Sequence, residues 1–162
     1  IDISKNLFTD KSLENFLYID ILIKIFPKAK FIYCRRNYIA NLLGILKVFL
    51  PNLLWCHSLE KIMIFMELYE NKLNQILSEK KINLKIIDIE SFSADPLNNS
   101  KKLFEFLNIK WDKKVLNMNK NNQSIVKTVS NVQVRGKIIK HDLSYLKSYL
   151  PFLREYGVNK LT

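Results

Sequence analysis

Two short runs rich in β-branched and aromatic residues, separated by a long stretch of helix-patterned sequence, constrain the fold of this chain most strongly. The first run, AKFIYC, covers residues 29–34, and the second, LKIIDI, covers residues 84–89. Runs of this length and composition are typical of strands, and we expect the first to be a buried strand. Strands joined by long helical connections pair in parallel. The sequence therefore predicts an α/β fold with a parallel sheet flanked by helices.

Helix-boundary residues mark the segments on either side of the first strand. Ser12 is a suitable N-cap for an apolar helix that Pro27 ends. Asn37 can cap a second helix, which covers residues 38–50 and stops before Pro51. This part of the chain therefore follows the order helix, strand, helix.

The same signals place three later helices. Ser58 begins the most clearly amphipathic segment of the chain. The pair Asp95–Pro96 supplies an N-cap and a first-turn proline for a helix through Leu107. A final helix is expected to open at Asp142 and to be broken near its end by Pro151.

Composition limits the chain to one globular domain covering residues 1–162. Of the 162 residues, 48% are hydrophobic, which is enough for a core, and the polar, Asn-rich stretch 117–123 is expected to be a loop rather than a linker. The two cysteines, Cys34 and Cys56, are too few for a disulfide scaffold or a zinc site, so we expect reduced thiols, no metal and a cytoplasmic location. No apolar run reaches the roughly 18 residues that a membrane span needs.

Basic charge raises a second class of function. The formal net charge is +11, which suits a nucleic-acid-binding module. The lysines are scattered over the predicted helix faces, however, without the alternation of aromatic and basic residues that marks a stacking platform. Nucleic acid is therefore the weaker alternative.

Polar side chains directly follow the first predicted strand. Arg35, Arg36 and Asn37 come between this strand and the next predicted helix. Ligands bind beyond the carboxyl ends of parallel strands, where helix N-termini favour anions. Spacing alone leaves two interpretations open, an anion site and ordinary surface charge on a basic protein.

Four segments in order along the chain resemble one enzyme family. They are FTDKSLENFLYI, FPKAKFIYCRRNYIANLLGILKVF, DIESFSADP with KKLFEFLNIKWD, and TVSNVQVRGKIIK. Together they are similar to sulfotransferases that use 3′-phosphoadenosine 5′-phosphosulfate, especially bacterial members that often follow tetratricopeptide repeats. The resemblance implies a P-loop NTPase-like sulfotransferase fold and transfer of a sulfonate group from this co-substrate to the hydroxyl or amine of an unidentified acceptor.

The resemblance assigns the nucleotide site residue by residue. Arg36 matches the family arginine that binds the 3′-phosphate, and Gly44 stands where the family has a phosphate-binding serine. Arg135 matches a second phosphate ligand, with Ser130 and Gln133 as polar neighbours for which loop solvation is an equal alternative.

Other departures from the family affect the turn and the adenine site. Asn37 and Tyr38 replace the Asp and Pro that usually follow the arginine, which keeps a capping side chain but loses a rigid turn. Ile89 replaces a tyrosine near the adenine, whereas Glu90 is retained.

The resemblance and the residue chemistry supply three candidates for catalysis. Lys11 matches a lysine near the transferring sulfuryl group, where its charge would offset that of the sulfonate oxygens; a solvated lysine is the alternative. His57 is a candidate general base because histidine titrates near neutral pH, and Glu14 is a second candidate.

One family element is missing from the sequence. The family binds the 5′-phosphosulfate in a glycine-containing loop after its first strand, and the chain has only three glycines, none in such a loop. Because the chain also opens on Ile1, we interpret it as an N-terminally incomplete fragment that is inactive alone. A decayed domain kept for protein interaction is the remaining alternative.

Overall fold

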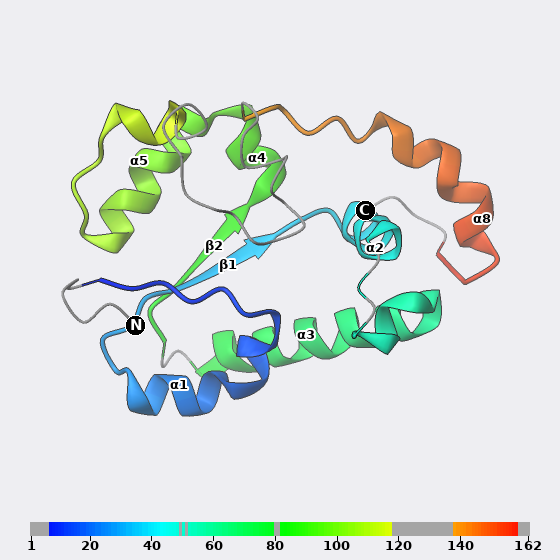
Figure 1. The fold of residues 1–162 in the computed structure, drawn as a ribbon, viewed down its shortest axis with the longest axis horizontal. Helices are drawn as coiled ribbons and strands as arrows, with labels where there is room; N and C mark the ends of the chain where they lie inside the picture. The colour runs from blue at the N-terminus through cyan, green and yellow to red at the C-terminus, as the bar shows by residue number, and fades with distance from the viewer. Residues whose placement is uncertain (1–6, 49, 51, 80–81, 118–137, 159–162) are drawn as a thin grey trace.

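The computed structural model describes residues 7–48, 50, 52–79, 82–117 and 138–158, and two parallel strands lie at its centre (Figure 1). Strand β1 covers Phe31–Arg35 and strand β2 covers Leu84–Asp88. They pair in register from Phe31 opposite Leu84 to Arg35 opposite Asp88. The parallel pairing predicted from the sequence is confirmed, and both strands end at the same edge.

Helices connect the two strands and cover them from two sides. From β1 the chain passes through α2 (Tyr38–Lys47), the 3₁₀ helix η2 (Leu54–His57) and α3 (Leu59–Glu79) to reach β2. In Figure 1, α1 (Ile19–Ile25) and α3 lie on one side of the strands, and α4 (Ile89–Ala94) and α5 (Pro96–Leu107) lie on the other. Contacts from Tyr33 to Glu70 of α3 and from Lys85 to Phe106 of α5 agree with this arrangement.

The main core lies where α2, α3 and the C-terminal helices meet. Ile39 and Leu42 of α2, Ile62 of α3, and Leu146 and Leu153 of the C-terminal part are each at most 1% exposed. Fully burying a side chain of this kind contributes about 1.5–3 kcal/mol. The core therefore fixes α2, which begins at the end of β1, against the rest of the domain.

Predicted capping residues hold the helix ends. Asn37 Oδ1 accepts a hydrogen bond from the backbone N–H of Ala40 at 3.0 Å, which caps α2. Asp95 caps α5 in the same way through Asn98 N–H at 3.2 Å, and Pro96 lies in the first turn as expected. These caps satisfy backbone donors that the first turn of a helix leaves unpaired.

The helix predicted from Ser12 to Pro27 is present in two parts. It begins as the 3₁₀ helix η1 (Leu13–Tyr18) and continues as α1. The ring of Phe16 anchors it by packing against the rings of Phe65 and Tyr69 of α3, at centroid distances of 5.5 and 4.4 Å.

The segment after α5 packs back on that helix. Trp111 Nε1 donates a hydrogen bond to Ser100 Oγ at 2.9 Å, and the short helix η3 (Lys113–Asn117) follows. Ser100 is buried, so Trp111 contributes to the packing of α5.

Three predictions about local structure were wrong or incomplete. Strand β1 is only partly buried, with Ile32 40% exposed, because the described residues place a neighbouring strand on one of its edges only. The C-terminal helix begins as η4 (Ser144–Tyr149), and Pro151 lies in the first turn of α8 (Leu150–Arg154) rather than breaking a helix near its end. Proline is tolerated in a first turn because its missing N–H has no partner there. Helix α4 was not predicted.

Across these described segments, no helix combines the length and apolar character needed to cross a bilayer.

Candidate functional site

The carboxyl ends of β1 and β2 bring together polar side chains from two distant parts of the sequence. Arg35 at the end of β1 lies 3.5 Å from the Asp88 carboxylate at the end of β2. Glu90, two residues further along, accepts a hydrogen bond from the backbone N–H of Asn37 at 3.1 Å. These two contacts hold the β1–α2 turn and the start of α4 beside each other.

Asp88 also caps the short helix that follows it. Its Oδ1 accepts the backbone N–H of Ser91 at 3.0 Å. This hydrogen bond, with a smaller contribution from the charge of Arg35, lowers the pKa of the Asp88 carboxyl group. Asp88 therefore has a structural role, and its charge offsets that of Arg35. Arg36, the next residue, forms no ion pair with a carboxylate of the described residues.

Arg36 is the most unusual side chain at this edge. It is half-buried, and its Nε atom is buried without a hydrogen-bond partner among the residues that the structure describes. An unpaired buried donor costs about 1–3 kcal/mol, so native structures rarely keep one without a reason. An anion bound at the guanidinium would supply the missing acceptor.

Gly44 makes room for this guanidinium on the surface of α2. A Cβ atom at position 44 would lie 3.2 Å from Arg36 Nη1, closer than side chains normally approach. The absence of a side chain therefore lets the arginine lie along the first two turns of α2. The sequence predicted that Gly44 and Arg36 belong to one site, and the structure brings them together.

The predicted catalytic residues are all exposed. His57 is exposed, and its Nε2 lies 3.2 Å from the carbonyl oxygen of Leu50, beyond the C-terminal end of α2. Helix α2 has 10 residues and a length of about 15 Å, and Arg36 precedes its opposite end. Lys11 and Glu14 are exposed near the start of η1, where Glu14 accepts a hydrogen bond from Ser12 Oγ at 3.2 Å.

Ser130, Gln133 and Arg135 lie outside the described residues. The described chain resumes at Ile138, and the backbone N–H of His141 donates to Ser93 Oγ of α4 at 3.2 Å. The described chain at His141 therefore lies beside α4, whose N-terminus is at the same edge of the sheet as Arg36.

Sequence reasoning missed the two hydrogen-bonded links that build this edge. The contacts of Glu90 with Asn37 and of Asp88 with Arg35 join residues more than fifty positions apart. The sequence does place both segments at the carboxyl ends of parallel strands. This predicts that the segments are close together, but not which side chains form hydrogen bonds. Within the described ranges, no group of three or more His, Cys, Asp or Glu residues is arranged to hold a metal ion.

Comparison with known proteins adds an independent observation. A family model described as "Sulfotransferase family" matches residues 2–113, more than two thirds of the chain, and this region contains η1, both strands, and the Arg36 and Gly44 site. No curated protein matches the chain. On the strength of the family match, this chain belongs to the sulfotransferase family.

Proposed function

We propose that the chain takes part in sulfonate transfer from 3′-phosphoadenosine 5′-phosphosulfate, within a P-loop-like fold, and that Arg36 binds the 3′-phosphate of this co-substrate. Membership of the sulfotransferase family supports sulfonate transfer as the reaction. The co-substrate supplies a sulfonate group activated by its anhydride bond to phosphate.

The unpaired donor of Arg36 is the observation that carries the proposal. The guanidinium has a planar array of donors that matches phosphate in a bidentate manner, and its buried Nε has no acceptor among the described residues. Each hydrogen bond to a charged partner contributes about 1.5–3 kcal/mol. The residues at this position thus fit an anionic group of the size and charge of a phosphate.

The N-terminus of α2 adds to the same anion preference. Arg36 directly precedes Asn37, the N-cap of this 10-residue helix, whose dipole favours negative charge. Because Gly44 has no hydroxyl group, the phosphate contact rests on Arg36 and backbone groups rather than on a serine. We expect a weaker phosphate site than one with both side chains.

Other site residues keep the roles that the family resemblance gave them, as parts of the proposal. Arg135 would be the second phosphate ligand, with Ser130 and Gln133 beside it, and Lys11 would offset charge near the sulfuryl group. Glu90 has a different role, because its carboxylate already accepts the N–H of Asn37 and so positions the Arg36 turn.

In the transfer step, an acceptor oxygen or nitrogen would attack sulfur while the bond from sulfur to the phosphate oxygen breaks. The acceptor would lose one proton to a general base. His57 stays a prediction for this base, and its place beyond the far end of α2 from Arg36 lends it no support. Because the sequence contains no loop for the 5′-phosphosulfate, we expect nucleotide binding without transfer from this chain alone.

Calorimetric titration with adenosine 3′,5′-bisphosphate tests the proposal. We expect saturable binding that Arg36→Ala weakens by at least about tenfold, the loss of one charged hydrogen bond. Arg154→Ala is the matched control, since Arg154 is an exposed arginine of α8 and its removal lowers the net charge equally. Equal losses in both variants, with steep salt dependence, would show general polyanion binding instead.

A further inference from the structure

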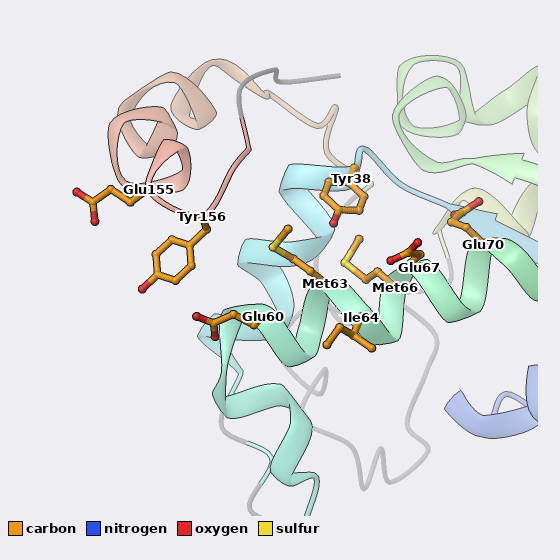
Figure 2. A pocket seen from close by; sticks show the side chains of 9 residues that line it. All are labelled: Tyr38, Glu60, Met63, Ile64, Met66, Glu67, Glu70, Glu155 and Tyr156. Carbon is orange, nitrogen blue, oxygen red and sulfur yellow. The ribbon is translucent and has the colours of Figure 1, made fainter.

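A groove on the outer side of α3 has mostly apolar walls. Its volume is about 720 Å³, within the size range of small-molecule sites. Figure 2 shows Met63, Ile64 and Met66 along α3, with Tyr38 of α2 beside the two methionines and Tyr156, just after α8, near Glu60. Ile64 is 59% exposed, so the groove presents apolar surface to solvent.

Carboxylates surround this apolar surface. Glu60, Glu67 and Glu70 follow one another along α3, and Glu155, just after α8, also lines the groove, with its carboxylate directed outward (Figure 2). In the part of the chain that the structure describes, none of the four forms an ion pair with a lysine or arginine. On a chain of net charge +11, the groove is thus a region of opposite sign to the molecule as a whole.

Glu67 is the carboxylate most available to a ligand. Glu60 accepts a hydrogen bond from Ser58 Oγ at 2.6 Å, and Glu70 accepts one from Tyr33 Oη at 2.7 Å. Glu67 faces Tyr38, and its charge adds to burial in raising the pKa of the tyrosine. No hydrogen bond from a described residue occupies the Glu67 carboxylate.

We propose that this groove binds an extended cationic amphiphile, a molecule that carries separate ammonium groups on an apolar chain. Methionine and tyrosine side chains suit the apolar chain, and tyrosine faces also attract ammonium groups. Glu60 and Glu70 are ten residues apart on α3, or about 15 Å along the axis, so charges at both ends of one ligand can be met. A compact single cation would use only part of this arrangement.

The groove is a different site from that of the nucleotide. Tyr38 lines the groove and is separated from Arg36 in the sequence only by the helix cap Asn37. The charges of the two sites are opposite, since Arg36 favours an anion and the groove carboxylates favour a cation. The proposal therefore stands or fails independently of nucleotide binding.

Titration of the whole chain with 1,12-diaminododecane tests the proposal. We expect saturable binding that weakens with added salt, is weaker for 1,4-diaminobutane and is absent for 1,12-dodecanediol. Glu67→Gln should lower the affinity by about threefold, and the triple change of Glu60, Glu67 and Glu155 to Gln by about tenfold or more, as expected for partly exposed charge pairs.

A control variant distinguishes binding in the groove from binding elsewhere on the chain. Glu105→Gln removes an exposed carboxylate on α5 and should leave diamine binding unchanged. The glutamate variants all change exposed side chains, and circular dichroism would confirm that every variant is folded.

Three results would overturn the proposal. These are equal binding of the diol and the diamine, equal losses in Glu67→Gln and Glu105→Gln, and absence of diamine binding in a chain that self-associates at low salt. The last result would assign the groove to a second copy of the chain. Loss of adenosine bisphosphate binding alone would contradict the proposed function and leave the groove proposal intact.

Discussion

The guanidinium of Arg36 lies against Gly44, where an added Cβ atom would come within 3.2 Å of Nη1. This contact joins the residue that follows β1 to the second turn of α2, and the Nε atom of the same arginine is buried without a hydrogen-bond partner among the described residues. The size of the residue at position 44 therefore limits where the Arg36 guanidinium can lie.

Gly44→Ala separates helix stability from phosphate binding. Replacing glycine inside a helix by alanine stabilises it by about 0.5–1 kcal/mol, while the new methyl group displaces the tip of Arg36. We expect a higher midpoint in urea denaturation together with a several-fold loss of adenosine bisphosphate affinity. Gly44→Ser should recover part of the affinity because its hydroxyl can donate to the phosphate. Unchanged binding in Gly44→Ala would contradict the role given to this contact.

Asp88 gives the edge of the sheet a dependence on pH. The hydrogen bond from Ser91 and the charge of Arg35 lower the pKa of Asp88 below its ordinary value of 3.8. A depressed carboxyl pKa stabilises the fold above the unfolded-state value, and this stabilisation is lost as the pH falls through the lower folded-state value. Asp88→Ala should cost about 1 kcal/mol at pH 7, the typical effect of losing an N-cap.

Urea denaturation of the wild type and Asp88→Ala at pH 7 and pH 3 measures this effect. The difference in unfolding free energy between the two proteins should shrink at pH 3. A difference of the same size at both values would show that the carboxylate charge contributes nothing.

Tyr33 should make the stability of the fold decrease at alkaline pH, whereas Asp88 makes it decrease at acidic pH. Burial first, and then its hydrogen bond to Glu70, raise the pKa of the Tyr33 phenol. Because the folded state holds this proton more tightly, the stabilisation is present below about pH 10 and is lost as the pH rises. Tyr33→Phe should cost about 1 kcal/mol at pH 7 through the lost hydrogen bond, and its stability should fall less between pH 9 and pH 11.

Alkaline absorbance titration checks the assignment of the late-titrating phenol. The wild type should show tyrosines that ionise above the ordinary range, and Tyr33→Phe should lack the last of them. Identical titration curves would show that Tyr33 ionises normally.

Most of the secondary structure could be predicted from the sequence because several helices begin at residues with a strong preference for helix ends. Asn37 and the pair Asp95–Pro96 are strong boundary signals, and each begins a helix as predicted. Pro151 misled because proline is compatible with both a helix end and a first turn, and periodicity does not separate the two. Helix α4 is six residues long, too short to show a helical period.

Of the candidate site, only the nearness of Arg36 and Gly44 could be predicted from the sequence. Arg36 and Gly44 are eight residues apart on one strand–helix unit, so a local resemblance could identify both. The links of Asp88 to Arg35 and of Glu90 to Asn37 depend on strand pairing, which fixes register only in three dimensions. The sequence indicated no site at the carboxylates of α3, because nothing in their spacing shows that Tyr156 lines the same groove.

The central claim, that Arg36 binds the 3′-phosphate, is tested most directly by a cycle of two ligands and two proteins. Calorimetry would compare adenosine 3′,5′-bisphosphate with adenosine 5′-monophosphate, on the wild type and on Arg36→Ala. We predict that the 3′-phosphate improves affinity for the wild type by about 10- to 150-fold, corresponding to a charged hydrogen bond, and gives no such gain for the variant. An equal preference for the bisphosphate in both proteins would contradict the account.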